Sequence, residues 1–212
     1  MQLTRNQPLE PAQSALLYID VQNFCARRDG GEFKDISKAE FEEKYGWFFN
    51  RLEAETLPNM QKLQAACRDA GVEVMYTTIE SLTKDGRDRS LDYKITGFNV
   101  AKGSWDGKVL DAIAPGDDEI VLSKTSSSVF ISTHIDYILR NLGVRQLVIS
   151  GLITDQCVEG AVRDACDLGY LVTLVSDACM TYSQERQDHS LATIRGYCRQ
   201  VTTAELVAEL AG

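Results

Sequence analysis

Short apolar runs alternate with segments of helical periodicity along most of the chain. The runs at 15–21, 72–79, 119–124, 146–151 and 170–178 are rich in branched and aromatic residues. Runs of this length and composition, bounded by glycine or polar residues, are typical of buried β-strands. The sequence therefore predicts at least five strands.

Helical patterns fill the segments between these runs. From Leu57 to Ala70, apolar residues recur at every third or fourth position, and Gly71 then ends the pattern. Similar patterns predict helices at 132–143, 157–169, 184–197 and 203–210, and a further short strand at 199–202.

The regular alternation of strands and helices predicts an α/β fold. Strands that are apolar along their whole length indicate a parallel sheet covered on both faces. With right-handed crossovers, this gives a three-layer α/β/α sandwich with a mostly parallel, doubly wound sheet. The length of 212 residues, with 44% hydrophobic and 25% charged residues, indicates a single domain over 1–212. The segments 25–49 and 81–107 lack a regular pattern, and we expect them to act as lids.

Charge and cysteine content narrow the class of protein. The net charge of −9, without a basic run, disfavours nucleic acid and anionic membranes as partners. The sequence predicts neither a signal peptide nor a membrane span. The six cysteines contain no Cys-x-x-Cys pair, and there are only two histidines, so no metal site and no cofactor are predicted. We expect a cytoplasmic protein with reduced thiols.

Polar side chains with complementary chemistry follow three of the predicted strands. Asp20, Lys124 and Cys157 stand at or just beyond strand ends, where ligands bind in doubly wound sheets. A helix start and a nearby ammonium favour the thiolate form of a cysteine. Asp20 can move protons, and backbone N–H groups of the loop before Cys157 can stabilise an oxyanion. The set suits acyl transfer from a small amide, although packing or capping roles remain open for each residue.

Three longer motifs resemble those of a known family. They are "LLYIDVQNFC", "GSWDGKVLDAIAPGDDEIVLSKTSSSVFISTHIDYILRNLG" and "LVISGLITDQCVEGAVRDACDLGYLVTLVSDAC". In this order they are similar to the motifs of the isochorismatase-like cysteine hydrolases, and together they cover roughly 15–189. By this resemblance, Asp20, Lys124 and Cys157 match the catalytic triad.

The resemblance also implies backbone features and an assembly. A cis peptide would lie between Leu152 and Ile153, and the N–H groups of Ile153 and Cys157 would form the oxyanion hole. Family members commonly form dimers or tetramers, so a homo-oligomer is expected.

Departures from the family pattern narrow the substrate to a small linear amide, a ureide or a carbamoyl compound. No histidine precedes His134, whereas the nicotinamidases of the family carry an Asp/His metal site after the first strand. True isochorismatases cleave a vinyl ether and lack the nucleophilic cysteine, which argues for an amide here. Two alternatives remain: vinyl ether hydrolysis with an incidental thiol, and an inactive interaction protein on the same scaffold.

One further departure concerns the charge of the substrate. Ser126 stands where many relatives have an arginine, so the substrate is either uncharged or bound by another cation, with the candidates Arg27, Arg28, Arg87 and Lys102. The remaining expected substrate-binding residues are polar or aromatic and lie near the strand ends or in the irregular segments: Gln22, Asn23, Phe24, Trp105, Phe130 and Gln187. For these, a turn, core or capping role is the alternative.

Overall fold

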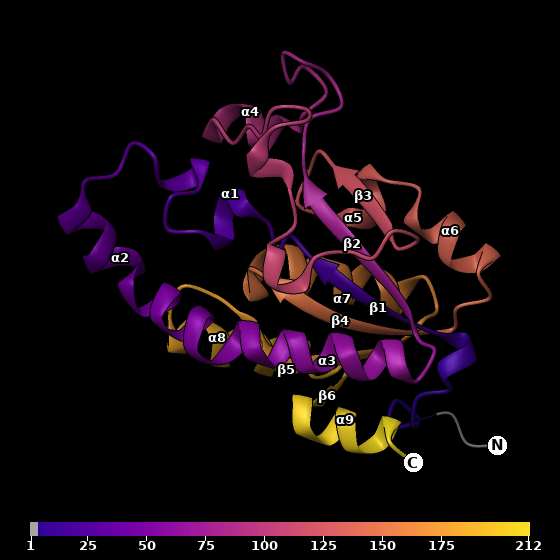
Figure 1. The fold of residues 1–212 in the computed structure, drawn as a ribbon. Helices are drawn as coiled ribbons and strands as arrows, with labels where there is room; N and C mark the ends of the chain where they lie inside the picture. Colours follow the sequence, from indigo (N-terminus) through magenta and orange to yellow (C-terminus); the bar gives the residue numbers. More distant parts are fainter. Residues whose placement is uncertain (1–3) are drawn as a thin grey trace.

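One parallel sheet organises the computed structural model, which describes residues 4–212 (Figure 1). Its strands run in the spatial order β3-β2-β1-β4-β5-β6, and every neighbouring pair is parallel. The strands are β1 (Ser14–Ile19), β2 (Glu73–Ile79), β3 (Ile120–Lys124), β4 (Gln146–Leu152), β5 (Leu171–Met180) and β6 (Arg199–Val201).

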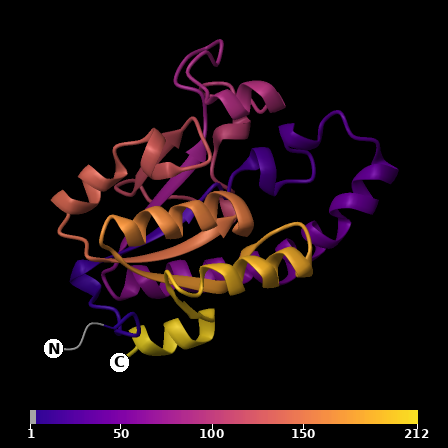
Figure 2. The same ribbon diagram turned by 180° about the vertical axis from the view of Figure 1, so that it is seen from behind.

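Helices cover both faces of this sheet. They are α1 (Asn23–Ala26), α2 (Lys38–Arg51), α3 (Leu57–Asp69), α4 (Leu91–Thr96), α5 (Val129–Ser132), α6 (Ile135–Asn141), α7 (Glu159–Asp167), α8 (Gln184–Ile194) and α9 (Thr203–Leu210). Figure 1 looks onto the face that carries α3 and α9, and Figure 2 onto the face that carries α7 and α8. No helix among residues 4–212 is both long and apolar enough to cross a membrane.

Alternate residues of β1 enter two separate hydrophobic cores. Leu16 and Tyr18 pack with the residues of α2, α3 and α9, whereas Leu17 and Ile19 pack with those of α5 to α8. Each side chain of a strand points to the face opposite its neighbour's, so a strand buried on both faces is apolar throughout. The predicted three-layer α/β/α sandwich is confirmed, whereas the single-domain organisation over 1–212 stays a prediction.

Three local predictions differ from the structure. The segment 38–51, most of which was expected to be irregular, is helix α2, and this helix projects past the strands in Figure 1. A π-helical turn, Leu52–Thr56, joins it to α3. Phe41, Phe48 and Phe49 of α2 are buried in the core that contains Leu16 and Tyr18. The helix predicted at 132–143 is shorter, α6 over Ile135–Asn141, and a separate helix, α5, precedes it and ends at Ser132. Helical backbone before α7 begins at Thr154, in a π-helical turn, rather than at Cys157.

The chain reverses its direction of winding between β1 and β4, which lie side by side at the centre of the sheet. Strand β4 can approach β1 closely there because position 151 is glycine. A Cβ at Gly151 would lie 2.2 Å from the Ile19 carbonyl oxygen, and its φ of +138° lies in the region that favours glycine. The crevice at such a reversal is where doubly wound sheets bind ligands.

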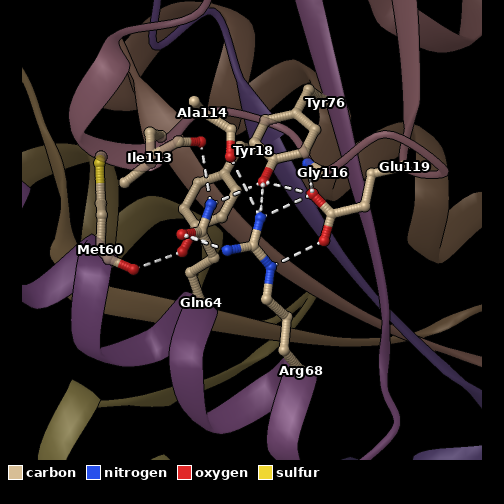
Figure 3. Close-up of polar contacts among 9 residues, drawn as sticks. All are labelled: Tyr18, Met60, Gln64, Arg68, Tyr76, Ile113, Ala114, Gly116 and Glu119. Atoms are coloured by element: carbon tan, nitrogen blue, oxygen red, sulfur yellow. Dashed lines mark hydrogen bonds and ion pairs between the residues drawn. The ribbon is translucent and has the colours of Figure 1, made fainter.

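A polar network joins α3 to β2 and to the loop before β3 (Figure 3). Arg68 donates to both carboxylate oxygens of Glu119 at 2.8 Å, and Gln64 donates to the Tyr76 hydroxyl at 2.6 Å. Tyr76 in turn donates to Glu119 at 3.0 Å. Because buried polar groups are costly without partners, the network holds the loop before β3 against α3.

Candidate active site

Asp20 follows β1 directly and has an unusual backbone. Its φ is 55°, in the left-handed region that aspartate tolerates better than most residues. Its N–H donates to the Thr77 carbonyl at 3.0 Å, so the residue is tied to the end of β2. The carboxyl group is 2% exposed, and Thr77 Oγ1 lies 3.4 Å from Oδ1.

Lys124 ends β3 and reaches across β2 to the centre of the sheet. Its Nζ lies 2.8 Å from Asp20 Oδ2 and donates to the Ser126 carbonyl at 2.8 Å. Cys157 Sγ and Tyr93 Oη each lie 3.5 Å from the same nitrogen. The lysine side chain is completely buried. One ammonium group therefore contacts both the carboxylate and the thiol.

Cys157 lies in the π-helical turn that follows β4, and it is 8% exposed. Besides Lys124, its sulfur has the Ser127 hydroxyl as a neighbour at 3.5 Å. The structure thus brings Asp20, Lys124 and Cys157 into mutual contact, as their positions at strand ends indicated.

Burial sets the protonation of this group. It raises the pKa of Cys157 to about 11; Lys124 opposes this effect and Asp20 adds to it. Burial also raises the pKa of Asp20, against the opposing effect of Lys124. Burial alone would lower the pKa of Lys124, but Asp20 and Cys157 outweigh it and the pKa is raised. The expected stabilisation of a thiolate by Lys124 is present but smaller than the effect of burial, so this environment favours the neutral thiol.

A cavity of about 460 Å³ opens onto this group. Asp20 and Cys157 line it together with residues from α1, α4 and the loops beyond β4 and β5. Figure 1 shows α4 above the carboxyl end of β2. Asp92, Tyr93 and Thr96 of this helix line one side of the cavity. The two segments that were expected to act as lids contribute six of the fourteen lining residues: Cys25, Glu32, Asp92, Tyr93, Thr96 and Phe98.

The cis peptide implied by the family resemblance is present between Leu152 and Ile153. Both residues line the cavity beside Cys157. These residues therefore belong to the same wall, and the oxyanion role of the Ile153 and Cys157 N–H groups stays a prediction.

None of the six residues expected to bind substrate lies among those that line the cavity. Gln22 is completely buried and bonds to the backbone of Ile79 and Asp106. Asn23 donates to the Trp105 carbonyl at 2.9 Å. These two amides tie neighbouring segments to the end of β1, and their role in substrate binding stays a prediction.

The aromatic candidates and Gln187 are used elsewhere. Phe24 packs edge-on against Phe98, Trp105 is 45% exposed beneath the Arg27 guanidinium, and Phe130 packs into the second core. Gln187 donates to backbone carbonyls of β5. Sequence position alone did not reveal the direction in which these side chains point.

Several lining residues were missed from the sequence. Tyr182 follows β5 and lies at the same edge of the sheet as Asp20, so the strand-end rule applied to β5 would have identified it. Ser127, next to the noted departure at Ser126, contacts the Cys157 sulfur directly. Glu32 and Tyr93 lie in the irregular segments and carried no signal of their own.

The four candidate cations do not line the cavity either. Arg27 pairs with Asp29, Arg28 with Glu53 and Arg87 with Asp85, all near the surface. Lys102 is exposed. Over residues 4–212, no three His, Cys, Asp or Glu side chains form a group that could hold a metal ion.

Comparisons with known proteins find relatives over most of the chain. The chain is 28% identical to a ureidoacrylate amidohydrolase of Rhizobium rhizogenes, over 92% of this chain and 86% of that protein. It superposes on a cysteine hydrolase from Pseudomonas syringae pv. phaseolicola with a TM-score of 0.79 at 26% identity, covering 97% and 96% of the two chains. An N-carbamoylsarcosine amidase from Thermoplasma acidophilum gives 0.67 at 25% identity, covering 90% and 96%. The family model described as the isochorismatase domain matches residues 14–206, and the chain belongs to the isochorismatase family as an isochorismatase-like cysteine hydrolase.

Proposed function

We propose that this protein is a cysteine amidohydrolase that cleaves the C–N bond of a small linear amide, in particular a ureide or carbamoyl compound. The amidohydrolase and amidase relatives support the type of bond. The observation that carries the proposal is the contact of Lys124 Nζ with both Asp20 and Cys157 at the wall of a cavity.

The first half of the reaction forms a thioester. Asp20 accepts the proton of the neutral Cys157 thiol while the sulfur attacks the amide carbon. The carbonyl oxygen becomes an oxyanion, which the backbone N–H groups of Ile153 and Cys157 stabilise. Asp20 then passes its proton to the leaving nitrogen, the C–N bond breaks, and ammonia or an amine departs.

The second half releases the acid. Asp20 takes a proton from water, and the resulting hydroxide attacks the thioester carbon. Collapse of the second tetrahedral intermediate breaks the C–S bond, and Asp20 returns its proton to the Cys157 sulfur. Lys124 remains charged throughout, so it balances whichever neighbour, the carboxylate or the thiolate, is negative at each step.

Replacement of the nucleophile tests the proposal. Cys157→Ala and Cys157→Ser should lower ammonia release from ureide substrates by at least about 10³-fold. Cys198→Ala is the matched control, because Cys198 is buried beside α8, where its thiol contacts the Ile194 carbonyl, and should retain activity. Circular dichroism checks that each variant is folded. Full activity in the Cys157 variants would exclude the mechanism.

Two further measurements address the alternatives, vinyl ether hydrolysis and an inactive scaffold. Pyruvate release from isochorismate that survives alkylation of Cys157 by iodoacetamide would indicate vinyl ether hydrolysis. Absence of any covalent adduct or turnover across ureides, biuret and carbamoyl amino acids would indicate an inactive scaffold.

Two further parts of the proposal concern the cell and the assembly. We propose a cytoplasmic homo-oligomer, on the sequence features and the family resemblance given above. Light scattering of the purified protein measures the assembly, and a monomeric mass would contradict it.

A further inference from the structure

The charges that face the cavity are predominantly negative. Its lining includes the carboxyl groups of Asp20, Glu32 and Asp92. Lys124 compensates Asp20 at 2.8 Å, which leaves the other two without a cation in contact. Among residues 4–212, no lysine or arginine lines the cavity.

Two basic side chains that contact lining residues are bound to other groups as well. Arg89 donates to the carbonyls of Gly86 and Phe98 at 2.9 and 2.8 Å. Arg186 lies over the Tyr182 ring, and its guanidinium forms an ion pair with Asp155 at 2.6 Å. Neither arginine lines the cavity.

Glu32, in contrast, lines the cavity and can meet a ligand there. It lies on the short turn Gly31–Phe33, and its carboxyl accepts a hydrogen bond from Tyr182 Oη at 2.9 Å. Over residues 4–212 this is its only hydrogen bond, so one oxygen is left for a ligand. Burial raises the pKa of Glu32 to about 7. Glu32 and Cys157 line the same cavity.

We infer that the substrate presents N–H donors, from an uncharged amide or an amine, to the Glu32–Tyr182 pair, and carries no carboxylate at that end. The inference rests on the proposed function and names its substrate class. Above about pH 7, where Glu32 is charged, a carboxylate held in this cavity would face like charges without a counterion, which is strongly unfavourable away from water. An N–H donor instead completes the bonding of Glu32, and a carboxylate acceptor gives the strongest bond with an ammonium group.

Three ureides of similar length test the inference: N-carbamoyl-β-alanine, its amide N-carbamoyl-β-alaninamide, and N-(3-aminopropyl)urea. They end in a carboxylate, a carboxamide and an ammonium group. Ammonia release should give kcat/KM values at least about 100-fold lower for the carboxylate than for the better of the other two. The ranking of the amide and the amine shows which N–H donor is preferred. Turnover of the carboxylate at an equal or higher kcat/KM would overturn the inference.

Variants connect the preference to Glu32. Glu32→Gln should narrow the gap between carboxylate and amine by about tenfold, through KM rather than kcat, because it removes the negative charge and keeps the shape. Tyr182→Phe should raise the KM of the preferred substrate with little change in kcat. Glu43→Gln, an exposed change on α2 outside the cavity lining, should leave the gap unchanged. An unchanged gap in Glu32→Gln would contradict the role of this residue.

Calorimetric binding to the Cys157→Ala protein separates this inference from the reaction. If no ureide is hydrolysed but the amide or amine binds more tightly than the carboxylate, the proposed reaction fails and the inference stands. If the carboxylate binds most tightly, or none of the three binds, the inference fails whatever the reaction proves to be.

Discussion

The buried ion pair between Lys124 and Asp20 has an energetic weight that a double-mutant cycle measures. The two side chains are 0% and 2% exposed, and the charged atoms lie 2.8 Å apart. At an effective dielectric constant of about 20, this separation corresponds to an attraction of about 6 kcal/mol, and the lost hydration of both ions offsets much of it. Removal of either partner leaves a lone buried charge. Lys124→Met and Asp20→Asn should therefore each lower the free energy of unfolding by about 3–5 kcal/mol.

The double variant removes both charges. Its loss in the free energy of unfolding should be smaller than the sum of the two single losses by at least about 2 kcal/mol. Lys124→Met also strips a donor from the Ser126 carbonyl, but that loss occurs in the single and the double variant and cancels in the cycle. Urea denaturation of the four proteins at neutral pH, followed by circular dichroism, gives the energies. Strictly additive losses would refute the reasoning that the two charges depend on each other.

Three other predictions concern the scaffold and the cavity. Gly151→Ala should lower the free energy of unfolding by at least about 3 kcal/mol, because its Cβ would meet the β1 backbone. At the control position Gly160 in α7, a Cβ meets nothing within 4 Å, so Gly160→Ala should be neutral or stabilising by up to about 1 kcal/mol. Equal effects of the two substitutions in thermal unfolding would contradict this. Because burial raises the pKa of Glu32 from 4.5 to about 7, its contribution to stability is complete below the lower value and about 3 kcal/mol is lost as pH rises through the higher one. Urea denaturation at about pH 4 and about pH 8 measures the change in the free energy of unfolding. The control variant Glu43→Gln should show this loss and Glu32→Gln should not, and the same change in both variants would exclude the effect. Arg68→Leu should cost only about 1–2 kcal/mol, since the side chain is 38% exposed and water screens its ion pair, and an unchanged melting temperature would contradict the network in Figure 3.

The meeting of Asp20, Lys124 and Cys157 was predictable because it depends on topology. The carboxyl ends of parallel strands lie at one edge of a sheet, so residues that follow different strands come together there whatever the loops do. The alternation of apolar runs and helical patterns was sufficient to give the sheet, and thereby this edge.

The walls of the cavity were not predictable in the same way. Whether Phe24 or Glu32 faces the cavity depends on the path of a short irregular segment, and composition does not determine that path. Gln22 and Asn23 illustrate the difficulty, because a buried amide beside an active site serves a backbone contact as readily as a ligand. Helix α2 was missed although its aromatic residues repeat at helical spacing, since Gly46 and a run of aromatics resemble an irregular segment.

The side chain of Gln22 has a consequence for what evolution can change at the end of β1. Its amide accepts from the Ile79 N–H at 2.6 Å and donates to the Ile79 and Asp106 carbonyls at 2.9 and 3.0 Å. The side chain thus makes hydrogen bonds to β2 of the kind that a β1 backbone would make if the strand continued. Glutamate at this position would have nearly the same shape, but one of its carboxylate oxygens would face the two carbonyl oxygens in place of the amide donor. A residue whose side chain is bound to the backbone is thereby held to a single chemical identity.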